Sequence, residues 1–197
     1  MKTDNMDRKI LFSDLDGTLL NDQKKITEGN LEAIHSLIEA GHGFAFVTGR
    51  PTFSGIKIAK KYGLLEDGFF VVGYNGGEIY DAGSDSFIFR KSMSYEEGDF
   101  LLKLAYEKGF TGITYDSHQV LCKSAGEALD VYCRDLGAPY RAIDDPIEYL
   151  KEHDYEPLKV ILCTLKGREH LEKCRDEIEP KVGDSLYTLV TSDILLE

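Results

Sequence analysis

The sequence predicts an α/β fold in which a doubly wound parallel core is followed by a second α/β domain. Three short apolar runs alternate with two helical patterns in the first half of the chain. An order of strand, helix, strand, helix, strand is typical of a parallel sheet whose crossovers are helices. The second observation is a change of character between residues 83 and 92, after which shorter elements follow. We therefore expect one domain over residues 1–85 and another over residues 86–197.

Each element of the first half has its own signal. The apolar run 10–12 predicts a strand buried on both faces, as strands inside parallel sheets are. A helix is expected from Thr27 to Ala40, because Thr27 can cap its start and apolar residues recur on one face. The other expected elements are the strand 44–47, the helix 52–62, the strand 69–72 and a turn at 75–77.

The second half opens on a capping-box sequence. Ser94 and Glu97 have the spacing at which each side chain can bond the backbone of the other residue at a helix start. Further on, strand and helix patterns alternate, which predicts a second sheet with helices packed on it. The expected elements are strands at 112–115 and 119–122, a helix at 125–135, a strand at 159–163, a helix at 167–178 and a strand at 186–190.

Composition and charge exclude several classes of partner. The 197 residues carry a formal net charge of −12, whereas binding to a nucleic-acid backbone needs a basic surface. Residues 1–9 are polar and lack the apolar segment of a secretory signal. No stretch approaches the roughly 18 apolar residues that a membrane span requires. We therefore expect neither nucleic acid nor a membrane as partner.

The four cysteines form no C-x-x-C pair, and no histidine lies near them at metal-binding spacing. Thiols without such a pattern are more often structural than ligands of a metal. This usage predicts reduced thiols in a cytoplasmic protein.

Asp14 and Asp16 directly follow the first expected strand, and Gly17 allows the backbone to turn sharply beside them. Ligands of open α/β sheets bind just outside the carboxyl ends of the strands. Two carboxylates this close repel each other unless a cation or a shared proton neutralises them, and oxygen ligands favour Mg²⁺. A solvated acidic turn is the alternative interpretation. The apolar strand before the pair and Gly17-Thr18 after it favour a site.

The segment DLDGT at residues 14–18 resembles the first motif of the haloacid dehalogenase superfamily, in the form common among its phosphatases. The resemblance implies a Rossmann-like core in which Asp14 is the nucleophile toward phosphorus and Asp16 is the general acid and base. It also implies that Asp14 and Asp16 hold a Mg²⁺ ion.

Thr48, Gly49 and Arg50 end the second expected strand and match the second motif of that superfamily, in the form typical of its Cof-like branch. The hydroxyl, the amides at the helix start and the guanidinium could hold a phosphate. A hydroxyl that caps the next helix and an exposed arginine are the alternatives. Asn75 and Gly76 also recur in that branch near the active site, although on this sequence alone a plain turn is the better interpretation.

The second half resembles the type IIB cap domain of Cof-like phosphatases. In that branch a lysine and a Gly-Asp-x-x-x-Asp segment follow the cap, and neither is found after it in this sequence. We therefore expect an incomplete core whose first strand has an exposed edge with unpaired backbone groups. Either the chain is a truncated product, or a second subunit of a homo-oligomer covers this edge.

By resemblance, the function is that of a Mg²⁺-dependent phosphomonoester phosphatase. It would act on a small phosphorylated metabolite through an aspartyl-phosphate intermediate. The missing motifs keep a second function open, that of a non-catalytic module which binds a phosphate ligand or another protein. Hydrolysis is not separated from phosphotransfer by any residue, and sugar phosphates, nucleotides and pyridoxal phosphate all remain open as substrates.

Overall fold

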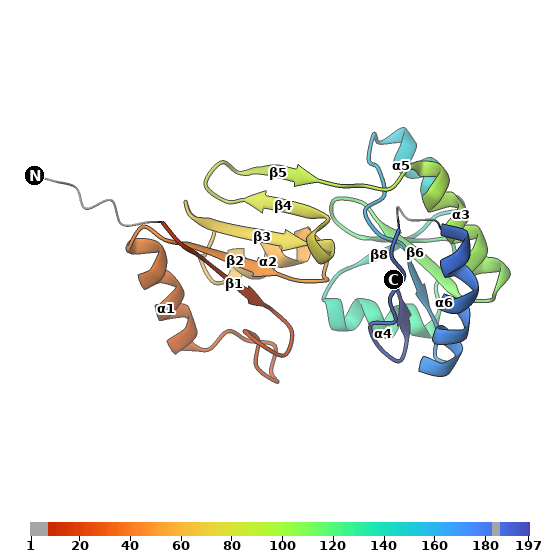
Figure 1. Cartoon of the computed structure of the whole chain (residues 1–197), viewed down its shortest axis with the longest axis horizontal. Helices are drawn as coiled ribbons and strands as arrows, with labels where there is room; N and C mark the ends of the chain where they lie inside the picture. Colours follow the sequence, from red (N-terminus) through yellow and green to blue (C-terminus); the bar gives the residue numbers. More distant parts are fainter. Residues whose placement is uncertain (1–7, 183–185) are drawn as a thin grey trace, which may run out of the picture. The chain divides into compact units, whose positions relative to one another are not determined.

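The computed structural model describes residues 8–182 and 186–197 (Figure 1). The chain divides into two compact units at Lys91 and Ser92. Each unit contains one sheet, and each is described by itself below. None of the helices in the described ranges is long and apolar enough to cross a bilayer.

The first unit contains a five-stranded sheet in the order β1-β2-β3-β4-β5. Strands β1, β2 and β3 run parallel, whereas β4 and β5 pair antiparallel. The parallel α/β core predicted from the sequence is therefore confirmed. The elements are β1 (Ile10–Asp14), α1 (Glu28–Glu39), β2 (Gly43–Val47), α2 (Thr52–Lys61), β3 (Phe69–Gly73), the 3₁₀ turn η1 (Tyr74–Gly76), β4 (Glu78–Asp81) and β5 (Ser86–Arg90).

Helices α1 and α2 pack on the sheet through one apolar cluster. The Thr27 hydroxyl accepts a hydrogen bond from the Asn30 N–H and so caps α1 as expected. Ile34 of α1 and Ala59 of α2 belong to the same buried cluster as Phe46 of β2. The Phe46 ring also meets the Phe69 ring edge-on at 4.8 Å. These contacts fix the helices to β2 and β3, whose carboxyl ends carry the loops described below.

Strand β1 departs from the prediction. It was expected to be buried on both faces, but Ile10, Leu11 and Phe12 are 45%, 55% and 62% exposed. Among the described residues β1 pairs with β2 alone, so it is an edge strand. An apolar run indicates a strand suited to burial, but whether the strand is buried depends on which elements pack beside it. The expectation of an exposed first edge is confirmed.

The second unit contains another five-stranded sheet, in the order β10-β9-β6-β7-β8. The predicted capping box forms at the start of α3, where Ser94 and Glu97 bond each other's backbone. The four cysteines lie in this unit as buried free thiols. Its elements are α3 (Tyr95–Glu107), β6 (Thr111–Tyr115), β7 (Val120–Cys122), α4 (Glu127–Leu136), β8 (Tyr140–Ala142), α5 (Pro146–Glu152), β9 (Ile161–Cys163), α6 (Arg168–Val182) and β10 (Leu195–Leu196).

The last strand also differs from the prediction. The expected strand at 186–190 does not form, and the strand beside β9 is β10 instead. Leu189 exchanges backbone hydrogen bonds with Glu197, and Val190 bridges to Leu196. The segment therefore folds back on the chain end, because the turn between the two stretches directs residues 195–196 rather than 186–190 onto β9.

Candidate functional site at the carboxyl ends of β1, β2 and β3

The first part of the site is the turn that follows β1. Leu15 is fully buried, whereas the neighbouring Asp14 and Asp16 are exposed. Gly17 has a φ of 78°, which favours glycine, so the predicted sharp turn is present. The Leu19 N–H donates to the Asp14 carbonyl at 3.2 Å, which closes the turn. Burial of Leu15 thus anchors a loop that presents both carboxylates to solvent.

The loops after β2 and β3 are joined to each other by hydrogen bonds. In the parallel register Asp14 lies opposite Val47, so Thr48 follows at the same edge of the sheet as the β1 turn. Thr48 is buried, its hydroxyl accepts from the Arg50 N–H at 3.1 Å, and its carbonyl accepts from the Asn75 N–H at 3.1 Å. These contacts bring the second and third predicted segments together.

Gly49 and Asn75 are in direct contact. A Cβ atom at position 49 would lie 2.7 Å from the Asn75 Oδ1 atom, so a larger residue would have to displace the Asn75 side chain. Asn75 itself has a φ of 56°, which asparagine tolerates better than most residues. Gly76 follows with a φ of 96° at the end of η1, where it turns the chain toward β4.

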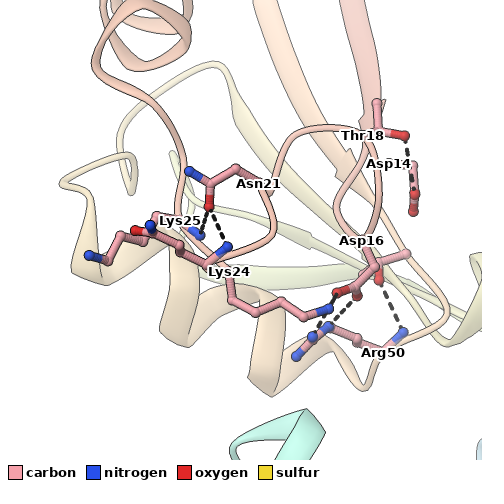
Figure 2. A network of polar contacts seen from close by, with 9 residues as sticks. Asp14, Asp16, Thr18, Asn21, Lys24, Lys25 and Arg50 are labelled. Atoms are coloured by element: carbon pink, nitrogen blue, oxygen red, sulfur yellow. Dashed lines mark hydrogen bonds and ion pairs between the residues drawn. The ribbon is translucent and has the colours of Figure 1, made fainter.

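Arg50 and Lys24 both bind the carboxylate of Asp16, as Figure 2 shows. The Arg50 Nε atom lies 2.5 Å from Asp16 Oδ2, and its Nη2 atom lies 2.9 Å from Oδ1. The Lys24 Nζ atom lies 2.8 Å from the same Oδ1. The Arg50 side chain is 13% exposed, so it is not the exposed arginine of the alternative interpretation.

Lys24 was missed in the sequence. It lies in a hairpin after the DLDGT segment, and nothing in its own neighbourhood distinguishes it from Lys25. The available signal was Asn21, which is typical of a tight turn and stands close enough to Asp16 for the chain to return.

The environment of Asp16 lowers the pKa of its carboxyl group to about 2. Hydrogen bonding from Arg50 is the largest cause, and Lys24 acts in the same direction. Partial burial opposes them by disfavouring the charged form. Asp16 is therefore ionised throughout the neutral range in this arrangement.

The carboxylates of Asp14 and Asp16 offer oxygen atoms, the type of ligand that a hard cation such as Mg²⁺ prefers. The exposed Asp14 carboxylate accepts a long hydrogen bond of 3.5 Å from the Thr18 hydroxyl. The Asp16 carboxylate is bound by Arg50 and Lys24. Within the described ranges no group of three or more His, Cys, Asp or Glu side chains could hold a metal. Mg²⁺ suits so sparse a set because it keeps several of its waters.

Known proteins are similar to this chain over most of its length. The family model of haloacid dehalogenase-like hydrolases matches residues 11–197. A 5-amino-6-(5-phospho-D-ribitylamino)uracil phosphatase of Bacillus subtilis is 35% identical over 175 residues, covering 84% of this chain and 58% of its own length. Other curated relatives are covered to a smaller extent. This chain therefore spans little more than half the length of that Bacillus subtilis phosphatase.

Solved structures share the fold. A haloacid dehalogenase-like hydrolase from Bacteroides thetaiotaomicron superimposes with a TM-score of 0.84 at 22% identity, over 96% of this chain and 69% of that protein. A sugar phosphatase of subclass IIB superimposes with a TM-score of 0.70 at 16% identity, over 96% of this chain and 68% of that protein.

Proposed function

The chain belongs to the haloacid dehalogenase-like hydrolase family, and we propose on that basis that it acts as a phosphomonoester phosphatase. The observation that carries the proposal is the meeting of three loops at the carboxyl ends of β1, β2 and β3. They supply a carboxylate, a hydroxyl and backbone amides where ligands of open α/β sheets bind. A nucleophile, an anion-binding loop and charged neighbours are the parts that phosphoryl transfer needs.

Asp14 is the proposed nucleophile. Its carboxylate is exposed at the end of β1, and its backbone is held by the Leu19 N–H. Attack on phosphorus would form an aspartyl-phosphate, which water then hydrolyses, so that one difficult step becomes two easier ones. Asp16 would protonate the leaving oxygen and later take a proton from the attacking water. To do so, Asp16 must first lose the hydrogen bonds from Arg50 and Lys24.

Thr48, Gly49 and Arg50 are proposed to hold the transferred phosphoryl group. The loop begins at a buried hydroxyl and leads into α2, whose first N–H groups favour an anion. Asn75 contacts Gly49 and donates its N–H to the Thr48 carbonyl, which holds the loop in place. Gly76 contributes by turning the chain after Asn75.

Asp14, through its carboxylate, and Asp16, through its backbone carbonyl, would hold Mg²⁺. The ion would supply charge neutralisation to the phosphoryl oxygens. The protein's own part is to present the Asp14 carboxylate on a turn that is anchored by Leu15.

The second unit, which begins at Ser92 rather than at the predicted residue 86, is proposed to act as the cap that selects the substrate. The substrate would be a small phosphorylated metabolite, and the sugar phosphatase among the structural neighbours supports sugar phosphates as a first class to test. Four buried free thiols support a cytoplasmic location.

We further propose that a second copy of the chain covers the β1 edge. A groove of about 500 Å³ runs beside this edge and is lined by Leu11, Phe12, Leu37 and neighbouring residues. Arg8 and Lys9 precede β1, and Asp14 and Asp16 follow it. Antiparallel pairing of two β1 strands would therefore set Arg8 and Lys9 of one copy near the exposed Asp14 carboxylate of the other.

Sedimentation velocity tests the oligomer. The proposal predicts a dimer that the variant Phe12→Glu converts to a monomer, because a charge would enter the paired edge. A matched change at an exposed position of the other unit, Leu165→Glu, should leave the dimer intact. A wild-type chain that is monomeric at high micromolar concentration would refute the dimer.

A non-catalytic phosphate-binding module is the second candidate function. The observation in its favour is that Asp16, the proposed acid, is held by two cations, and that the described acidic groups near Asp14 are few. Such a site could bind a phosphorylated ligand without turning it over.

Hydrolysis of a generic aryl phosphate in the presence of Mg²⁺ separates the two functions. The phosphatase proposal predicts turnover by the wild-type chain and its loss in Asp14→Asn, which keeps the size of the side chain. Asp22→Asn, an equal change on the hairpin beyond the site, is the control and should retain turnover. A folded wild-type chain that binds phosphate but does not hydrolyse the ester would favour the binding module.

A further inference from the structure

Lys24 is mounted on a short hairpin that is fixed at both ends. Leu20 and Ile26, which bridge the two arms, are both buried. The Ile26 N–H also donates to the Tyr62 hydroxyl at 3.2 Å, which ties the hairpin to the chain just after α2. The hairpin is therefore a rigid support rather than a loose loop.

The turn of this hairpin is held by one side chain. The Asn21 Oδ1 atom accepts hydrogen bonds from the Gln23 N–H and the Lys25 N–H, both at 3.0 Å (Figure 2). The Asn21 backbone N–H donates to the Lys25 carbonyl, and its carbonyl accepts from the Lys24 N–H. The backbone on both sides of Lys24 is thus fixed.

Lys24 has a φ of 55°, in the left-handed region that a long side chain rarely adopts. Glycine or asparagine would fit this position with less strain. Strain of this kind persists where the surrounding structure imposes it, and it is concentrated at functional sites. Here it accompanies a side chain that turns back toward the end of β1.

The Lys24 ammonium reaches the same oxygen of Asp16 that Arg50 binds. The two cations lie 2.8 Å and 2.9 Å from Asp16 Oδ1. The single Asp16 carboxylate neutralises only one of these two positive charges, so this group of three side chains has a net charge of +1. The Lys24 side chain is 59% exposed, so it can move to a new partner at little steric cost.

We propose that Lys24 is a phosphate-binding residue of this site, whose ammonium exchanges Asp16 for an oxygen of the incoming phosphoryl group. The inference rests on the proposed function only in placing a phosphoryl group beside Asp14. A phosphate dianion is the stronger partner for the excess charge, because it offers several acceptor oxygens at a double charge. Lys24 would thus add a cation from the first unit to the loop formed by Thr48, Gly49 and Arg50.

Lys25 provides a matched control. It is the next residue and carries the same charge, but it contacts Asn21 through its backbone N–H and carbonyl. Lys24→Gln and Lys25→Gln therefore change the net charge equally and differ only in whether the Asp16-bound ammonium is removed.

Calorimetric titration of the full chain with inorganic phosphate, in the presence of Mg²⁺, tests the proposal. We expect Lys24→Gln to weaken phosphate binding about tenfold and Lys25→Gln to change it less than about twofold. Lys24→Arg should restore much of the affinity, because it returns a cation to the position. Equal affinities in Lys24→Gln and Lys25→Gln, or a wild-type chain that does not bind phosphate, would overturn the proposal.

Lys24→Gly separates phosphate binding from folding. Glycine relieves the strained φ, so the midpoint of thermal unfolding should stay the same or rise while phosphate affinity falls as in Lys24→Gln. Retained phosphate affinity in Lys24→Gly would show that Lys24 only shapes the hairpin. Phosphate binding through Lys24 without ester hydrolysis would support this proposal and refute the proposed phosphatase function.

Discussion

The two sheets of the chain contain similar strands but differ in how these are covered. In the second unit the inner strands β6, β7 and β9 are almost fully buried, and the edge strands β10 and β8 are only two and three residues long. In the first unit both edges, β1 and β5, are five residues long and expose large apolar side chains. Short edges protect a sheet, whereas long apolar edges invite a partner. We call the second unit closed and the first unit open, because only the second sheet has short edge strands.

The largest effect should come from the buried layer of the first unit. Phe46→Ala removes a fully buried ring that contacts Phe69, so we expect a loss of about 3–5 kcal/mol in the free energy of unfolding. At protein concentrations low enough to keep the chain monomeric, Phe12→Ser on the exposed β1 edge should change it by less than about 0.5 kcal/mol. Urea unfolding followed by circular dichroism measures both.

One outcome would contradict the expected difference in stability between Phe46→Ala and Phe12→Ser. A large destabilisation in Phe12→Ser would mean that a partner already covers β1 in solution. Repeating the measurement at several protein concentrations then separates the two cases, because the stability of an associated edge depends on concentration and that of a bare edge does not.

The second largest effect is a pH dependence of the free energy of unfolding, caused by the ion pairs of Asp16 in the first unit. Because the folded-state pKa of Asp16 is lowered to about 2 from the usual 3.8, its ion pairs stabilise the fold above the usual pKa. This contribution is lost as the pH falls from 3.8 toward 2. Asp16 is 38% exposed, so the stability involved is small even though the pKa shift is large.

Carbon-13 NMR of the Asp16 carboxyl group, without Mg²⁺, measures this shift directly. Arg50→Gln should raise the pKa of Asp16 toward its usual value, since Arg50 is the largest cause of the shift. Lys24→Gln should raise it less. A larger rise in Lys24→Gln than in Arg50→Gln would contradict the geometry, in which Arg50 donates to both carboxylate oxygens.

Local patterns in the sequence were sufficient for most elements of the fold. Thr27 caps α1, Ser94 and Glu97 form their capping box, and the strand starting at Phe44 lies where its apolar run predicts. Such features depend on neighbours within a few residues. The strand expected at 186–190 failed because competition between two apolar stretches for the same place on β9 is settled by tertiary packing.

The site was predictable in its composition but not in its contacts. Asp14, Thr48 and Asn75 could be placed at strand ends because parallel strands end at one edge. The side-chain network could not be foreseen, since Lys24 reaches Asp16 only through a hairpin whose return path is fixed by Asn21. Burial of β1 was wrongly predicted, because an apolar pattern does not say which covering elements are present.

A smaller loss in the free energy of unfolding is expected when the helix caps of the two units are removed. Ser94→Ala should destabilise the second unit by about 1 kcal/mol, because its hydroxyl and the Glu97 carboxylate satisfy backbone N–H groups reciprocally. Thr27→Ala should cost less, because a single, longer bond of 3.4 Å is lost in the first unit. Thermal unfolding of both variants checks the order, and a larger loss in Thr27→Ala would contradict it.

The last and smallest effect is the rate at which the cysteine thiols of the folded chain are modified. All four cysteines lie in the closed second unit. Burial raises the pKa of Cys133 to about 12 and also raises the pKa of Cys122, Cys163 and Cys174. Since the thiolate is the reactive form, the folded chain should react with iodoacetamide at pH 8 far more slowly than the urea-unfolded chain. Mass spectrometry over time gives the count of modified thiols. Rapid modification of the native chain would mean that the second unit opens readily, and the contrast between a closed and an open unit would then fail.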